Sequence, residues 1–323
     1  MAIGRNSITA FGEQDAKGTP AASMTKLLAT SNSLENNVET SQSNALISNR
    51  FTEDNYVTSF GPGGDIGVEV SKETIPAIIK HTIGSEPLDP VDLGVGSGPY
   101  KHKFQPAQTI EGWLTFLKYL KDAGYHELYK DCKVNQMTFN LTSKAVITYA
   151  LSILSILAES KLGVPTVTPA DNVGGKLFAW DTKAVNWNGA DIFSLINELN
   201  FTHNNNIDGD DYGLSRERRS LEVQGSEHTV NFTTKFDAAQ YFSLKDDLVK
   251  NNIIPVKINI GEVSGETDPY LAIDYPKLKL TQVQANIGGP DRVTVNIQGI
   301  ALWDNVQGYN VAVEIVDNQA TKY

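Results

Sequence analysis

The chain has 323 residues, of which 40% are hydrophobic and 20% are charged, a composition typical of a folded soluble protein. Its formal net charge of −11, with no block of basic residues, argues against a protein that grips nucleic acid by its phosphates. The single cysteine, Cys132, excludes an internal disulfide framework and a cysteine-rich zinc site, and we expect a small buried hydrophobe in a protein folded in the cytosol.

The sequence shows neither a secretory signal nor a membrane-spanning segment. The N-terminus has no apolar core after a basic start, so no secretory signal is expected. The longest apolar run, Ala145 to Ala158, is interrupted by polar residues and is shorter than the roughly 20 residues that span a bilayer. The length predicts about two domains of roughly 160 residues each.

The first 60 residues are polar and rich in Ser, Asn and Thr. We expect an arm or long loop here, with one short helix over Ser23 to Ala29. A long segment without its own core indicates partner contacts rather than packing.

A strand and a helix follow. Alternating Ile66, Val68 and Val70 predict a half-buried strand from Gly64 to Val70. The next four isoleucines lie at helical spacing: Ile75, Ile78, Ile79 and Ile83. Either Ser71 or Thr74 can cap this helix, Pro76 suits its first turn, and Gly84 can end it.

The rest of the first half reads as loop and strand. Residues 85–108 are Gly- and Pro-rich and predict a loop, whereas Thr109 to Leu120 fits either a helix or a strand. Cys132 to Leu141 and Lys144 to Leu154 alternate as two strands of a hairpin. Residues 160–190 form a second loop-rich stretch, where we place the boundary between two halves.

The second half repeats the order of the first. A strand is predicted from His228 to Phe236 and an amphipathic helix, capped by Asp237, from there to Asn251. Further strands are predicted as follows: Pro255 to Val263, Asp274 to Ile287, Asp291 to Asp304 and Gly308 to Asn318. Strands beginning at Gly64 and His228 lie 164 residues apart, and Ser48 and Ser215 lie 167 apart. Such spacing favours a duplication that preserves the order of the elements but little residue identity.

Between the halves, Asn204 to Gly213 has the oxygen-bearing side chains of a calcium loop. An EF-hand loop needs Glu at its twelfth position and an apolar residue at its eighth, and this stretch has Ser215 and Asp211 there. We therefore interpret it as a solvated turn, with calcium as the alternative. The arginines that follow predict local charge pairing or contact with another chain.

Catalytic motifs are not evident. The five histidines are scattered without a metal-binding spacing, and no nucleophile elbow or P-loop occurs. The glycine-rich stretch from Gly94 to Gly98 reads as a loop. Paired carboxylates such as Asp246 and Asp247 are adjacent and do not face each other. The sequence predicts no enzyme, cofactor or metal site, although a glycosidase pair leaves no local signature.

Three segments carry a family resemblance: GADIFSLINELN, GLSRERRSLEVQGSEHTVNFTTKF and DYPKLKLTQVQANIGGPDRVTVNIQGIALWD. With the helix between the last two, they resemble the tail tube (major tail) proteins of long-tailed, siphovirus-like bacteriophages. Arg216, Arg218 and Arg219 match the arginine positions of that family, and Trp303 with Asp304 matches its aromatic-Asp end. The strand HTVNFTTKF departs from the pattern because it lacks a glycine just before its aromatic.

The resemblance implies a mainly β fold with short helices (α+β). It implies two tandem tail-tube-like β-sandwich or barrel modules, each flanked by one α-helix: residues 1–160, with the N-terminal arm, and 161–323. Contacts between subunits are expected at loop and strand residues: Arg216, Arg218, Arg219, Asp208, Asp210 and Trp303.

The implied function is structural. Copies of the chain would form rings, a trimer with pseudo-sixfold symmetry being favoured and a hexamer the alternative. Stacked rings would build the virion's tail tube after synthesis in the host cytoplasm, with tape measure, terminator and tip proteins as partners and no membrane. DNA would pass through an acidic lumen without specific binding, whether or not the tail is contractile.

One alternative comes from a different class. A β-sandwich could be a glycan-binding adhesin or fibre protein, in which tryptophans stack on sugars: Trp113, Trp180, Trp187 and Trp303. Core or interface packing is the plainer role, at least for Trp113 and Trp303.

Overall fold

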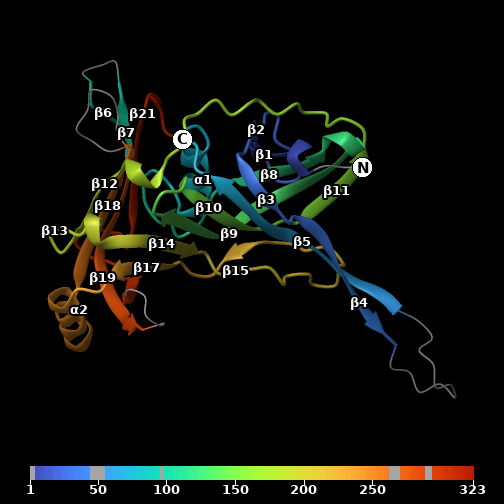
Figure 1. Cartoon of the computed structure of the whole chain (residues 1–323). Coiled ribbons are helices and arrows are strands. Elements are labelled where there is room, and N and C mark those ends of the chain that lie inside the picture. Colours follow the sequence, from blue (N-terminus) through green and yellow to red (C-terminus); the bar gives the residue numbers. More distant parts are fainter. Residues whose placement is uncertain (1–3, 44–54, 95–97, 262–269, 288–292) are drawn as a thin grey trace.

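The structure, a computed structural model, describes residues 4–43, 55–94, 98–261, 270–287 and 293–323 (Figure 1). Within these ranges the chain is mainly β with two short α-helices, which confirms the predicted fold class. The helices are α1 (Ile75–Thr82) and α2 (Ala238–Lys250), and single 3-10 turns are Gly4–Asn6, Lys121–Ala123, Ala179–Asp181 and Phe193–Leu195. No helix in the described ranges is long and apolar enough to cross a membrane.

The strands fall into two sets along the chain. The first set is β1 (Ser7–Gln14), β2 (Thr25–Lys26), β3 (Ala29–Asn32), β4 (Glu35–Gln42), β5 (Asn55–Glu69), β6 (Val91–Asp92), β7 (Tyr100–Phe104), β8 (Trp113–Leu120), β9 (Tyr125–Thr142), β10 (Thr148–Leu154) and β11 (Leu157–Leu162). The second set is β12 (Thr182–Trp187), β13 (Ala190–Asp191), β14 (Ile196–Asn204), β15 (Ile207–Asp208), β16 (Glu222–Val223), β17 (Glu227–Lys235), β18 (Ile254–Ile260), β19 (Leu271–Asn286), β20 (Thr294–Ala301) and β21 (Ala312–Asp317).

The two sets share one order of antiparallel pairing. In the first, β5 pairs with β10, β10 with β9, β9 with β8 and β11, and β8 with β1. In the second, β17 pairs with β20, β20 with β19, β19 with β18 and β21, and β18 with β12. Each set also places one helix directly after its first-named strand, and α1 lies near β9 as α2 lies near β19.

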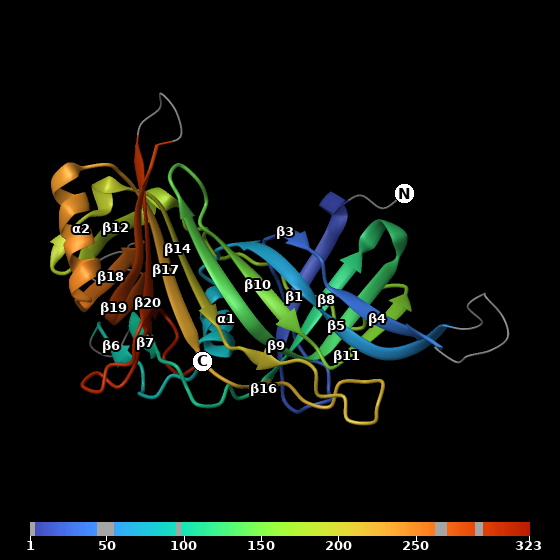
Figure 2. The ribbon, with the colours of Figure 1, turned by 90° about the horizontal axis from the view of Figure 1, so that it is seen from below.

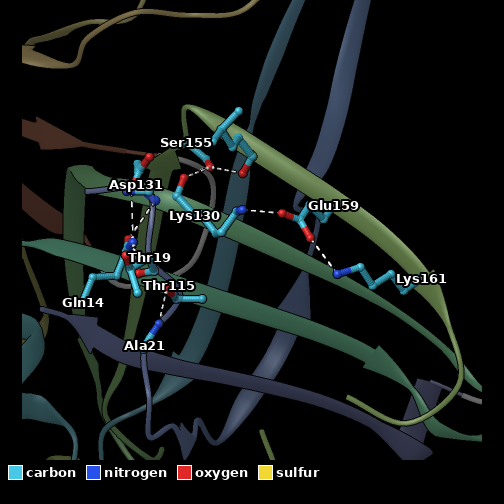
Figure 3. A network of polar contacts seen from close by, with 11 residues as sticks. Gln14, Thr19, Ala21, Thr115, Lys130, Asp131, Ser155, Glu159 and Lys161 are labelled. Carbon is cyan, nitrogen blue, oxygen red and sulfur yellow. Dashed lines mark hydrogen bonds and ion pairs between the residues drawn. The ribbon is translucent and has the colours of Figure 1, made fainter. Parts of the chain in front are cut away.

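The long strand β9 turns a corner between two layers at Asp131, whose φ of 54° is unusual for a non-glycine residue. Figure 3 shows what holds this conformation. The Asp131 N–H donates to Gln14 Oε1 (2.8 Å), and its carboxylate accepts from Gln14 Nε2 (3.1 Å) and from the Gly18 N–H (2.6 Å). Ser155 donates to the Lys130 carbonyl (2.7 Å), and Lys130 pairs with Glu159. These bonds let one strand serve both layers of the first set.

The helices follow the predictions with one difference. The isoleucines of α1 are fully buried, because the helix lies between the two sets of strands (Figure 1). Asp237 caps α2 by accepting from the Gln240 N–H at 2.9 Å, as predicted. Thr74 stands at the N-cap of α1 but makes no side-chain capping bond.

The N-terminal region is where the sequence interpretation was wrong. Strand β1 and its partner β8 form part of the first set, with Phe11 buried, instead of a free arm. Ser23 to Ala29 contains β2 instead of a helix, because its apolar residues pack on the layer formed by β1 and β8. In the described part of the N-terminal region, β4 and the start of β5 project from the body (Figure 1). Ser48 lies outside the described residues.

One ambiguous stretch is a strand, and one predicted loop also contains strands, so that loop prediction was wrong. Thr109 to Leu120 contains β8, and the predicted loop 85–108 contains β7, which pairs with β21 of the second set. There His102 is fully buried, with Nδ1 2.8 Å from Glu86 Oε1 and Nε2 3.2 Å from Asp317 Oδ1. Those two carboxylates raise the pKa of His102 against the opposing effect of burial. The predicted loop is therefore a built contact between the sets.

Candidate assembly surfaces

The two sets of strands join edge to edge. Strand β14 pairs antiparallel with β9 from Glu198 opposite Thr142 to Asn204 opposite Gln136. Phe201 stacks on Phe139 across this seam, with ring centroids 4.8 Å apart. One sheet therefore runs without a break through β5, β10, β9, β14, β17, β20 and β19 (Figure 2).

Residues 205–226, which we call the strap, connect β14 to β17 and lie across the first set of strands. Ile207 and Leu221 of the strap form a small buried cluster with Ile156. The Phe60 N–H donates to the Arg216 carbonyl at 2.8 Å, so the strap also lies beside β5. The strap thus fastens the second set onto the first.

Arg218 is the buried anchor of the strap, with 6% of its surface exposed. Its guanidinium donates to three backbone carbonyls: Gly209 (2.5 Å), Ser155 (2.6 Å) and Pro62 (3.1 Å). These carbonyls come from the strap, from the end of β10 and from β5, so one side chain ties three segments together. Arginine suits this role because its five N–H groups form a rigid fork.

The acidic turn in the strap is held by local bonds. Asn204 Oδ1 accepts from the Asn206 N–H (3.0 Å), and Asp208 Oδ1 accepts from the exposed Asp210 N–H (2.9 Å). Asn206 has a φ of 44°, in agreement with the predicted left-handed turn. Searched over the residues that the structure describes, no group of three His, Cys, Asp or Glu side chains could hold a metal ion.

The neighbouring arginines differ from Arg218. Arg219 keeps 65% of its side chain exposed and pairs with Asp211 at 3.0 Å, which is the local charge pairing that the sequence predicted. Arg219 and Ser220 both bond to that carboxylate, and the Ser220 hydrogen bond is the larger cause of its lowered pKa. Arg216 is exposed, and its carbonyl takes part in the contact with Phe60.

A histidine pair that sequence reasoning missed lies where β14, β17 and the strap meet. The Asn205 amide donates to the Thr82 and Val134 carbonyls (both 2.9 Å), so its oxygen accepts from His203 Nε2 at 2.7 Å. His203 Nδ1 is then the acceptor for the ring of His228, 3.0 Å away. Burial lowers the pKa of His203 to about 4 and holds the pKa of His228 well below its usual range, so both rings are neutral at pH 7. The residues are 25 positions apart, and no motif links them.

The tryptophans have unlike surroundings. Trp187 is buried edge-on against Phe232, and Trp113 lies under the Lys17 and Lys133 ammonium groups. Trp303 is 54% exposed in the loop after β20, and Val306 of the same loop is 86% exposed. Exposed apolar side chains on one loop suit a contact surface.

The continuous sheet has an open margin at each of its two ends. Within the described ranges, β3 and β4 pair on one side only, with β5. The end of β19 beyond Leu278 pairs on one side only, with β20, because β18 reaches no further than that residue. Open margins expose N–H and C=O groups that another strand can satisfy.

The uncovered face of the continuous sheet carries polar side chains, most of them neutral, with the carboxylates of Glu69 and Glu198 among them. One cross-strand row, which we call the polar row, runs over six neighbouring strands: Thr148, Asn140, Asn200, Asn231, Gln298 and Gln282. Beside it Thr138 and Thr202 share a hydrogen bond at 3.1 Å. Over these six strands the row presents amides and hydroxyls, and on β5 it continues with Glu69 opposite Thr148.

The family model that describes the phage tail tube protein matches residues 4–301, most of the chain. The chain belongs to that family. It is therefore a structural tail tube protein whose place is the tail of the virion. No curated protein matches the chain. Tail tube proteins associate with copies of themselves and with other tail proteins, so membership of the family explains why this chain has open sheet margins.

Proposed function

We propose that copies of this chain join edge to edge into closed rings, and that the rings stack into the hollow tube through which phage DNA leaves the virion. The observation that carries this proposal is the seam between β9 and β14, which already joins two similar strand sets into one sheet. A sheet with one open margin at each end can continue from chain to chain until it closes.

The chain is proposed to comprise two tail-tube modules, residues 1–160 and 161–323. The shared pairing order of the two strand sets supports this division, and β11 (Leu157–Leu162) spans the proposed boundary. If the seam repeats between chains, each chain supplies two steps of the ring. Pseudo-sixfold symmetry then needs three chains per ring, and six chains per ring is the alternative.

We propose that the polar row lines the lumen. Helices and further strand layers cover the opposite face of the sheet, and a ring has more room for them outside than inside (Figure 2). A wall made mainly of amides and hydroxyls, with few carboxylates, would not grip phosphates, so DNA would slide without specific binding. We propose this mostly neutral wall in preference to the acidic lumen that the net charge permits.

The remaining roles follow from position. Arg216, Arg218 and Asp208 would hold the strap within one chain, while Arg219, Asp210 and Trp303 are exposed enough to contact a neighbouring subunit or ring. Tape measure, terminator and tip proteins would meet the tube inside and at its ends. We assign no catalytic role to the chain.

Negative-stain imaging of concentrated protein, with mass measurement of its smallest ring, tests the proposal. Hollow tubes and a trimer mass are expected. Monodisperse monomers that bind a glycan array would favour an adhesin instead and would contradict the proposal.

A further inference from the structure

The two strand sets carry the same irregularity in the same place. In the β9–β10 ladder Thr148 faces Asn140, and the register skips Asn135. In the β19–β20 ladder Thr294 faces Asn286, and the register skips Thr281. Each skipped residue lies five positions before the polar residue that faces the threonine. Thr281 therefore corresponds to Asn135, and the end of β19 corresponds to the end of β9.

A second shared irregularity relates the other margins. The β3–β5 ladder skips Thr30, between Ala29 and Ser31. The β14–β17 ladder skips Asn197, between Ile196 and Glu198. Strands β3 and β4 face β5 in one register, so the correspondence extends along both: Ser33 to Asn200, Leu34 to Phe201, Glu35 to Thr202 and Asn37 to Asn204.

Within the chain, β14 occupies the margin of β9, with Asn200, Thr202 and Asn204 facing Asn140, Thr138 and Gln136. The corresponding margins, β3–β4 and the end of β19, are the open margins at the two ends of the continuous sheet. We infer that the β3–β4 margin of one subunit pairs with the β19 margin of a second copy of this chain. The register is Ser33 opposite Asn286, Glu35 opposite Gln284, and Asn37 opposite Gln282. This inference rests on the proposed ring and specifies its subunit seam.

The side chains on the two margins suit this register. Leu34 takes the place of Phe201 and meets Ala285, which takes the place of Phe139, so the apolar side of the seam stays apolar. On the polar side Glu35 meets Gln284 and Asn37 meets Gln282, pairs that can hydrogen-bond as Thr202 and Thr138 do.

The helices give independent support. At the seam inside the chain, α1 is buried, and the Asn205 side chain donates to the Thr82 carbonyl at its end. At the open end, α2 exposes Phe242 (75%) and Val249 (82%). The residue that corresponds to Asn205 is Val38, itself 49% exposed. A second copy seated on the β19 margin would bring Val38 toward this apolar helix surface.

In the single chain the β3–β4 margin is capped by its own side chains. The Ser33 N–H donates to the Asp65 carbonyl, so Leu34 directs its N–H and C=O to the open side. There the Leu34 N–H donates to Asn32 Oδ1 (2.9 Å) and its carbonyl accepts from Lys118 (2.7 Å). A partner strand in the inferred register exchanges the Asn32 cap for a backbone bond. Such caps guard a margin against wrong partners.

Cysteine cross-linking of assembled tubes tests the register. The pairs Glu35→Cys with Gln284→Cys and Ser33→Cys with Asn286→Cys place the two Cα atoms within disulfide range on the polar side of the seam. The matched control, Ser33→Cys with Gln282→Cys, uses the same two margins about 13 Å out of register. The native Cys132 is 1% exposed and gives little background.

On oxidation, both in-register variants are expected to give covalent dimers and then a closed trimer on a denaturing gel, at least tenfold more than the control. Equal yields from the control, or cross-links only within one chain, overturn the inferred seam. Tube formation is scored separately by electron microscopy. Tubes that form without in-register cross-links contradict the inferred register alone. If the unmodified chain forms no tubes, the proposed function is contradicted. Hydrogen exchange on the unmodified chain adds a check, because the amides of residues 32–37 and 282–287 must gain protection on assembly.

Discussion

Replacing Arg218 with alanine should loosen the strap and destabilise the chain. The side chain is buried and donates to the carbonyls of Gly209, Ser155 and Pro62. Pro62 also accepts from the Ser155 N–H, so we count only the other two carbonyls as losing a donor. A hydrogen bond from a charged donor contributes about 1.5 to 3 kcal/mol, so the two lost bonds should lower the free energy of unfolding by about 3 to 6 kcal/mol.

The assay is urea unfolding of the unassembled chain, with hydrogen exchange at the Phe60 amide as a local readout. Arg219→Ala is the matched control, since that side chain is exposed and its ion pair with Asp211 is screened by water. Arg218→Lys keeps the charge without the fork of donors and should fall between wild type and alanine. Equal unfolding midpoints for Arg218→Ala and Arg219→Ala, with unchanged Phe60 protection, would refute the anchoring role.

Three further outcomes are expected. The His81 ring, 3.0 Å from Glu13, lowers the pKa of the Glu13 carboxyl from 4.5 to about 2. The resulting stabilisation of the fold is complete above pH 4.5 and is lost as the pH falls toward 2. In an acid titration followed by circular dichroism, Glu13→Gln should remove the change in stability over that interval. Asn140→Lys in the polar row should leave tubes intact but slow DNA release, measured as phage infectivity and ejection rate. Lysine at the exposed Gln307 should leave DNA release unchanged. Equal effects of the two variants on DNA release would contradict the lumen assignment. Trp303→Ala should leave the unfolding midpoint unchanged but raise the protein concentration needed for tubes, measured by light scattering, and an unaltered threshold would rule out a contact there.

Local patterns predicted most of the central elements. Alternation at Ile66 and Val68, and again from Val230 to Phe232, marks strands with one buried face, and that periodicity depends only on the strand itself. Asp237 caps α2 as its position indicated. The repeated order of strand, helix and strands also led to the family, which the family model confirms.

Other features depend on contacts between distant segments. Strand β1 is polar at its ends, and it becomes a strand because β8, more than a hundred residues later, pairs with it. His203 and His228 meet only because β14 and β17 are neighbours in the sheet. In the sequence Arg218 looks no different from Arg216 and Arg219, yet the carbonyls that accept its hydrogen bonds include those of β5 and the end of β10. No local signal records such pairings.

Cryo-electron microscopy of tubes assembled from the unmodified chain tests the central claim most directly. Three chains per ring are expected, with β3 and β4 of each chain continuing the sheet of its neighbour at β19 and the polar row facing the channel. Particles that stay single, with both margins solvated at concentrations where virion tails form, would contradict it.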